Sequence, residues 1–394
     1  MFTAGWRTDS VLVVNAKLYR KPARMNSLLQ FLNAFSNLLQ TTLFPVLEQD
    51  LGPLPAQHRA LVEALGLLQM DRFVGAGSGP GRPPHSRANM LRAFVAKAVF
   101  GMSNTRALLD RLQSDAALRR ICGWESAGSV PGESVFSRAF AEFAASEVPQ
   151  RVHAALIERS YAAQIVGHIS RDSTAIVARE KDQSKSKTKR PRASRSKNRT
   201  PEQMTRVERQ SLPETTMEQV MADLPRLCDK GCKNDSKGLP SYWIGYKLHL
   251  DVADGQVPVS CMLTSASMHD SQAAIPLARL TASRLTSLYD LMDSAYDSQH
   301  IREFSQRLGH IAIIEPQKRG GKKLDLAPAE RARFAERTTV ERVYSRLKDE
   351  FGARSIRVRG YAKVMAHLMF GVIALAADQL LRFPERPAAA DCSS

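Results

Sequence analysis

Two aspartates, Asp172 and Asp293, lie at positions of predicted strands where a charged side chain suggests a chemical role. Asp172 interrupts the apolar, β-prone part of HISRDSTAIVAREKD (168–182), and a charge buried in a strand costs several kcal/mol unless it is paired or binds a metal. Asp293 follows the run SLYDLM and precedes a predicted helix, where open α/β sheets place their ligand sites. Either aspartate alone also fits a helix cap or a solvated strand end, so the pair needs a third member.

Glu341 supplies that candidate, in a predicted helix over 327–352. At about 100° per residue, one stripe of this helix is apolar: Val340, Val343, Leu347 and Phe351. A second stripe beside it is charged or polar: Arg337, Glu341, Tyr344 and Lys348. The row lies at the margin of the buried face, where a cleft would form. An i,i+4 salt bridge from Arg337 to Glu341 on a solvated helix is the alternative.

The elements that must position these residues follow from hydrophobic periodicity. Strands are predicted at 166–178, at 242–266 as a hairpin turning at Asp254-Gly255, at 287–295 and at 310–317, with a helix at 298–308. Asp270 is the expected cap of the helix after the hairpin. This order predicts an α/β fold with a mixed sheet flanked by helices. If the first and fourth strands are neighbours, Asp172 and Asp293 converge.

The N-terminal part is predicted to be all helical. A helical region over 1–74, most clearly at 25–73, precedes a Gly/Pro linker at 75–86 and a helical domain at 87–160. Within 87–124 we expect two helices broken near Gly101, with Ser103 as N-cap. The sheet domain spans 165–382, where the last helix, 361–381, packs on the sheet, and 383–394 is a disordered tail. No secretory signal is evident, the apolar run 368–377 is too short to span a bilayer, and five scattered cysteines fit a reducing cytosol.

These residues resemble a known signature. Phe334-x2-Arg337-x3-Glu341-x6-Lys348 is similar to the Y-(2)-R-(3)-E-(6)-K motif of bacterial insertion-sequence DDE transposases, with Phe334 in place of tyrosine. Asp172 in RDST and Asp293 in MDSAYDS take the places of that family's two aspartates. The hairpin YWIGYKLHLDVAD and its continuation, and the helices at 87–143, also look like parts of these enzymes, so the likeness covers roughly 87–380.

The resemblance implies an RNase H-like catalytic domain and a metal-dependent transposase. Asp172, Asp293 and Glu341 would be the catalytic carboxylates and would hold two Mg²⁺ or Mn²⁺ ions, hard cations that prefer oxygen ligands. The enzyme would cut double-stranded DNA at terminal inverted repeats and join the 3′ end to target DNA, as a homodimer in the bacterial, nucleoid-associated cytoplasm without a membrane. Arg337 and Lys348 would contact phosphate near the scissile bond. A metal-dependent nuclease without strand transfer, or a domesticated DNA-binding protein, is the alternative.

The charge of the chain points to the same kind of partner. There are 56 basic against 39 acidic residues, a net charge of +17, which suits nucleic acid or an anionic membrane surface. An insertion at 179–240 opens with a segment in which ten of 21 residues are Lys or Arg. This segment predicts disorder and phosphate binding through Lys185, Lys187, Lys189, Arg190 and Arg192, or else a solvated linker.

Other polar residues predict less. Cys228-x3-Cys232 is at most half of a zinc site, because the nearest further candidates are His249 and Cys261. His249 and His269 lie in or beside the predicted hairpin and are expected to be structural rather than catalytic.

Overall fold

The computed structural model describes residues 48–49, 52–75, 85–183, 203–234, 238–317 and 325–382. Several predictions fall outside these residues: the helix expected over most of 25–47, all but the ends of the 75–86 linker, the basic side chains from Lys185 to Arg192, and the 383–394 tail.

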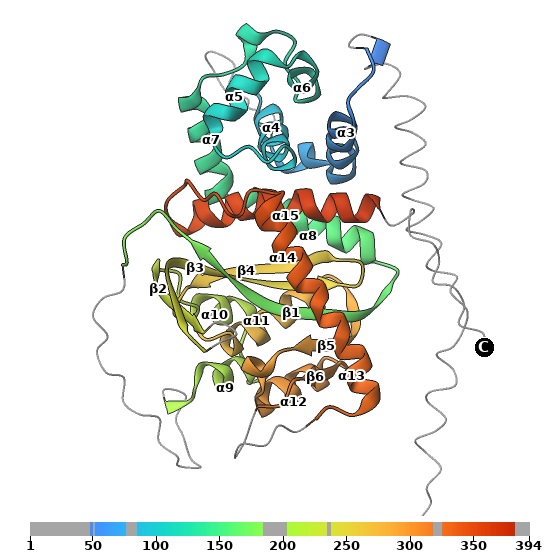
Figure 1. Ribbon diagram of the computed structural model, residues 1–394, viewed down its shortest axis with the longest axis vertical. Helices are drawn as coiled ribbons and strands as arrows, with labels where there is room; N and C mark the ends of the chain where they lie inside the picture. Colours follow the sequence, from blue (N-terminus) through green and yellow to red (C-terminus); the bar gives the residue numbers. More distant parts are fainter. Residues whose placement is uncertain are drawn as a thin grey trace, which may run out of the picture.

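The N-terminal half of the described chain is helical, as predicted (Figure 1). Its elements are α3 (Ala56–Leu68), η2 (Met70–Phe73), α4 (Arg87–Val99), α5 (Thr105–Ser114), α6 (Ala116–Ile121), η3 (Ala127–Ser129), α7 (Glu133–Ala145) and α8 (Val148–Tyr161). The stretch 87–124 contains three helices rather than the expected two, because Asp115 ends α5 and caps α6 by accepting from the Leu118 N–H. The N-cap of α5 is Asn104, so the prediction of Ser103 was wrong by one residue.

A mixed sheet forms the second half, and the predicted fold class is confirmed. Its strands are β1 (Ile165–Val177), β2 (Asp229–Asn234), β3 (Pro240–Ala253), β4 (Val257–Ser265), β5 (Thr286–Met292) and β6 (Ile311–Ile314). The order is β2-β3-β1-β5-β6, with β4 also paired to β3. β1 runs antiparallel to β3 and parallel to β5. The first strand and the strand that leads to Asp293 are therefore neighbours.

Helices cover both faces of this sheet. They are α9 (Arg206–Ser211), α10 (Met217–Ala222), α11 (Ser271–Ala282), η5 (Ser294–Tyr296), α12 (Gln299–Arg307), α13 (Pro328–Phe334), η6 (Ala335–Arg337), α14 (Thr338–Asp349) and α15 (Tyr361–Leu381). α14 packs on β1 and β3 from one face, and α11 packs on β3 and β4 from the other. The single helix expected at 327–352 is therefore α13 and α14 joined by a 3-10 turn.

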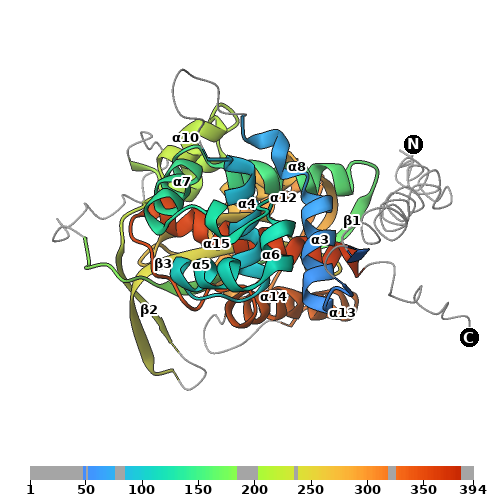
Figure 2. The same cartoon turned by 90° about the horizontal axis from the view of Figure 1, so that it is seen from above.

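The second half of the predicted insertion is folded, which the sequence did not lead us to expect. α9 and α10 each begin with a capping box, Thr205 with Glu208 and Thr216 with Gln219. β2 then pairs with the N-terminal end of β3, and this ribbon projects from the body of the molecule (Figure 2). β2 was missed because its sequence, DKGCKN, has no apolar alternation.

α15 lies between the helical half and the sheet (Figure 1). Among the described residues it is the one helix long and apolar enough to cross a membrane, but 83% of its most apolar window is buried inside the fold. A helix that is apolar on all sides is typical of a protein core. Its approach to the end of α14 depends on Gly371, since a Cβ there would lie 2.7 Å from the Phe351 carbonyl oxygen.

A buried ion pair joins the central strands. Arg171 on β1 lies opposite Asp251 on β3, and its Nε and Nη2 each donate to one carboxylate oxygen at 2.7 Å. The two side chains are 1% and 0% exposed. Thr281 of α11 also donates to Asp251, at 2.6 Å. Burial alone would lower the pKa of Arg171, but Asp251 and Asp290 raise it, so the guanidinium stays charged.

We expect Arg171→Met to lower the free energy of unfolding by about 3–5 kcal/mol, because it leaves the Asp251 charge buried and uncompensated. Adding Asp251→Leu should recover most of that loss, since the pair is then replaced by apolar groups. Urea denaturation measures both. Arg354→Ala, which breaks an exposed pair with Asp349, is the control and should cost less than about 1 kcal/mol. A double variant as unstable as Arg171→Met would contradict this account.

Candidate active site

Asp172 and Asp293 lie side by side where the pairing of two parallel strands ends. The paired register of β1 and β5 ends at Arg171 opposite Met292; Asp172 is the next residue within β1, and Asp293 is the first residue after β5. Side chains alternate between faces, so with Arg171 directed toward Asp251 and α11, Asp172 is directed toward α14. Asp293 begins η5, and its Oδ1 accepts from the Ala295 N–H at 2.9 Å.

The two aspartates carry charge that the protein only partly offsets. Burial raises the pKa of Asp172 to about 6, against the lowering effects of the Ser173 N–H and Arg337, and the Asp293 charge raises it further. Burial also raises the pKa of Asp293, while the Ala295 N–H and Arg337 lower it. Two partly buried carboxylates that repel one another are typical of a site that binds a cation or shares a proton.

Arg337 connects the third candidate carboxylate to this pair. Its Nη2 lies 3.1 Å from Glu341 Oε1, and its Nη1 lies 3.6 Å from Asp172 Oδ2. The i,i+4 pair with Glu341 is therefore present, as the simpler interpretation of the helix expected, but the same guanidinium also faces Asp172. The Glu341 side chain is 56% exposed. Within the described residues no three His, Cys, Asp or Glu side chains form a group that could hold a metal ion. At this site, Arg337 stands between Asp172 and Glu341.

Tyr344 fixes α14 to the strand that bears Asp172. Its hydroxyl donates to the Asp172 carbonyl oxygen at 2.5 Å and accepts from the Leu250 N–H at 3.1 Å. Burial raises its pKa well above the usual range, so it remains a neutral donor. Tyr344, which the sequence places in the polar stripe beside Glu341, is buried, and it determines where α14 lies on β1 and β3.

Two lysines border the carboxylates. Lys348 lies one turn beyond Tyr344, and its Nζ donates to Thr174 Oγ1 at 2.6 Å. Burial lowers its pKa, and the charges of Arg354 and Lys233 lower it further. Lys233 is exposed on β2, yet its charge is among those that lower the pKa of both Asp172 and Asp293. The sequence did not single out Lys233, because only the pairing of β2 with β3 brings it here.

Asp270 stands at the N-cap position of α11 but makes no capping hydrogen bond, so its predicted role was wrong. Its Oδ1 instead accepts from Lys247 Nζ on β3 at 2.8 Å.

The histidines and cysteines make local contacts. His249 is buried against Thr264 Oγ1 at 2.9 Å, and His269 contacts Ser271 Oγ at 2.8 Å. Cys228 is buried whereas Cys232 is exposed, and both are free thiols.

We expect Asp172→Asn to stabilise the protein in the presence of a chelator. A carboxyl whose pKa is raised on folding favours the native state when protonated, and that contribution is lost as pH rises from 3.8 toward about 6. At about pH 7 the neutral amide should therefore raise the free energy of unfolding by up to about 3 kcal/mol, and at about pH 4 by almost nothing. Denaturation at both pH values tests this, with the exposed Asp110→Asn as control. Equal stability of Asp172→Asn and wild type at about pH 7 would contradict a costly charge here.

Comparison with known proteins agrees with this site. A family model described as "Transposase DDE domain" matches residues 168–377, more than half of the chain, and this range includes all three carboxylates and Arg337. A second model, "Transposase domain (DUF772)", matches residues 55–142, from the start of α3 into α7. No curated protein and no solved structure matches the chain. The chain belongs to the family of transposases with a DDE domain.

Proposed function

We propose that Asp172, Asp293 and Glu341 are the acidic triad of this transposase. The observation that carries the proposal is the convergence of two partly buried, mutually repelling aspartates where parallel β1 and β5 stop pairing, with Glu341 joined to Asp172 through Arg337. The reaction is cleavage of DNA at the ends of an insertion sequence and transfer of the freed 3′ end into target DNA. Arg337, Glu341 and Lys348 match the YREK signature and support that finer grouping, from which Phe334 departs.

Transposases of this family generally use a divalent metal, and the residues fit one. The donors are carboxylate oxygens, which Mg²⁺ and Mn²⁺ prefer, and the raised pKa values of Asp172 and Asp293 mark negative charge in need of a cation. We assign two ions to these residues. Held by Asp172, Asp293 and Glu341, they would supply Lewis acidity to an in-line phosphoryl displacement.

The side chains around the carboxylates bind and orient DNA. Arg337 Nη1 donates no hydrogen bond within the described protein and faces Asp172 Oδ2 at 3.6 Å, so we assign this guanidinium to a phosphate oxygen that binds beside Asp172. Lys348, fixed on Thr174, presents a second cation on the same helix face. The Tyr344 hydroxyl donates to the Asp172 carbonyl oxygen. This hydrogen bond fixes the position of Arg337 and Lys348 relative to Asp172. A rigid cationic margin stabilises charge that develops on the phosphate.

The basic segment at 179–199 contacts DNA phosphates over a wider region, without regard to base sequence. Lys185, Lys187, Lys189, Arg190 and Arg192 form part of a run of ten cations in 21 residues. We assign it to phosphates away from the scissile bond, on terminal inverted repeats and on target DNA. With the net charge of +17, this supports a nucleoid-associated protein in the bacterial cytoplasm. The resemblance to insertion-sequence transposases further leads us to propose a homodimer on DNA.

Neutralising one triad carboxylate should abolish cleavage. Asp172→Asn, Asp293→Asn and Glu341→Gln should each reduce Mg²⁺-dependent nicking of an element end by at least about a hundredfold, since losing a single preorganised electrostatic contact already costs about 10²–10³ in rate. DNA binding should persist. The matched control is Glu303→Gln, exposed on α12, which should cut like wild type. A triad variant that cuts at near wild-type rate removes that residue from the site, and an assay for joined products distinguishes a transposase from a nuclease.

Replacing the Lys and Arg residues between Lys181 and Arg199 with Ser should reduce the salt dependence of binding. Each phosphate contact contributes about 0.9 to the slope of log affinity against log salt on duplex DNA, so the slope should fall by several units. Binding titrations across a salt series measure it for both proteins. Nicking at saturating DNA should survive, because the triad is unchanged. Equal salt slopes for the variant and the wild type would mean that this segment does not contact phosphates and is a passive linker.

A further inference from the structure

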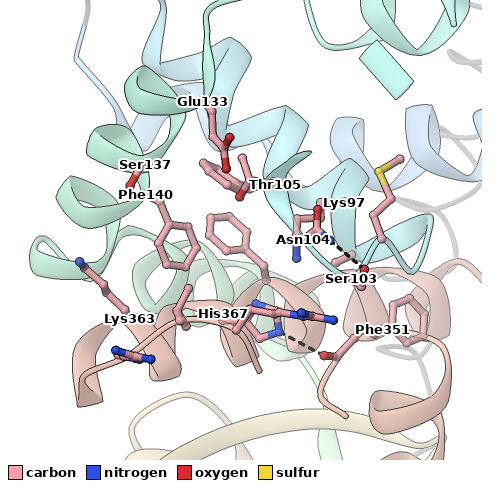
Figure 3. Close-up of a pocket in the computed structure, with 18 residues that line it drawn as sticks. Lys97, Ser103, Asn104, Thr105, Glu133, Ser137, Phe140, Phe351, Lys363 and His367 are labelled. Atoms are coloured by element: carbon pink, nitrogen blue, oxygen red, sulfur yellow. Dashed lines mark hydrogen bonds between the residues drawn. The ribbon is translucent and has the colours of Figure 1, made fainter. Parts of the chain in front are cut away.

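A cavity of about 440 Å³ lies where the helical half meets the segment that joins α14 to α15 (Figure 3). α4, α5 and α7 contribute one wall, and residues 351–359 with the start of α15 contribute the other. None of Asp172, Asp293 and Glu341 lines it. It is therefore a concave site distinct from the proposed triad.

The rim of this cavity is strongly cationic. Four basic side chains line it: Lys97, Arg357, Arg359 and Lys363. None of the four makes a hydrogen bond or ion pair with another residue that the structure describes. The one carboxylate in the lining, Glu133, already faces Arg106 at 3.3 Å. The positive charge here is therefore left for something outside the described chain.

Lys97 shows that this charge is costly to the protein alone. It is half-buried on α4, and burial lowers its pKa to about 8. His367, in the same lining, stays neutral: burial and the Lys97 charge lower its pKa to about 4, and its Nε2 lies 3.1 Å from the Gly352 carbonyl oxygen. A desolvated cation with no counter-charge is stabilised by an anionic ligand that reaches it.

The floor of the cavity is aromatic. Phe94, Phe140, Phe351 and Phe370 contribute to it through the small exposed part of each residue, at most 9%, and Figure 3 shows the Phe140 ring among the side chains that face the space. Cations at the rim and phenyl rings beneath them are the combination that binds single-stranded DNA, because phosphates meet the charges and bases stack on the rings. The volume is that of a pocket for one small ligand. A duplex, which presents its phosphates on an open surface, does not enter such a space.

We propose that this cavity holds one nucleotide of an unpaired DNA strand, with its phosphate at Lys97, Arg357, Arg359 and Lys363 and its base against Phe140. The inference rests on the proposed function, in which DNA is the substrate. α14 leads from Glu341 to its last residue, Asp349, eight residues and therefore about 12 Å further on, and Phe351 follows two residues later. This length is about three to four nucleotide steps at about 3.4 Å each along a duplex strand. A strand held at the triad can thus extend to the cavity.

The test compares three fluorescein-labelled probes of equal length by anisotropy with the full chain: oligothymidine, an abasic strand and a duplex. The double variant Arg359→Ser/Lys363→Ser changes two exposed side chains with no protein partner among the described residues, so the fold should persist. It and Lys97→Met should each weaken oligothymidine binding by about tenfold and duplex binding by less than about twofold. Phe140→Leu should weaken binding of oligothymidine but not of the abasic strand. The control, Arg307→Ser on α12, removes an exposed cation elsewhere.

Equal losses on oligothymidine and duplex, or wild-type binding by every cavity variant, would overturn the proposal. A Phe140→Leu protein that loses affinity for the abasic strand as well would overturn the base contact. Wild-type cleavage of an element end, measured on the same preparation, separates this inference from the function on which it rests. Cleavage without the probe differences leaves the transposase site standing and removes the cavity, whereas a wild type that neither binds nor cuts DNA removes both.

Discussion

The ion pair between Arg171 and Asp251 fixes the register of the sheet. Arg171 faces Met292 on β5 and Asp251 on β3, so a single residue sets β1 against both neighbours. A slip of one position would turn Arg171 toward α14 and Asp172 toward α11, and would bury each charge without its partner. Such a pair contributes little net stability, because desolvation offsets the attraction. Its contribution is specificity, since the correct pairing is the one in which this charge is neutralised.

Asp172 and Asp251 are carboxylates on adjacent strands, and they differ in how completely the protein neutralises their charge. Asp251 receives two hydrogen bonds from Arg171 and one from Thr281, and nothing further can approach it. Asp172, on the other face, has a guanidinium at 3.6 Å and a pKa raised to about 6. The sheet thus satisfies one charge completely and leaves the next one underpaired. A binding site for a cation needs this kind of incomplete neutralisation, which folding alone does not favour.

Patterns that depend on local periodicity predicted much of this structure. β1, the β3–β4 hairpin and α15 were all expected near their observed bounds. The convergence of Asp172 and Asp293 was expected on the condition that their two strands are neighbours, and β1 and β5 are. The position of Arg337 between Asp172 and Glu341 was not predictable. It depends on where α14 packs on the sheet, and the hydrogen bond of the Tyr344 hydroxyl determines that. Lys233 and β2 were not predictable either, since a ribbon edge with exposed charges has no apolar period. The pockets between helices depend on packing that no single segment encodes.

α15 gives the two halves of the molecule one interior. Its buried residues belong to a hydrophobic cluster that extends from Leu61 on α3 to Leu380, and that also includes Val166 and Leu250 of the sheet. The helices that match the second transposase domain cannot swing against the sheet without opening this cluster. In a transposase whose helices contact DNA and whose cut lies beside Asp172, this shared core fixes the distance between the two. The interval between the bound bases and the broken bond is then set by the packing of the protein.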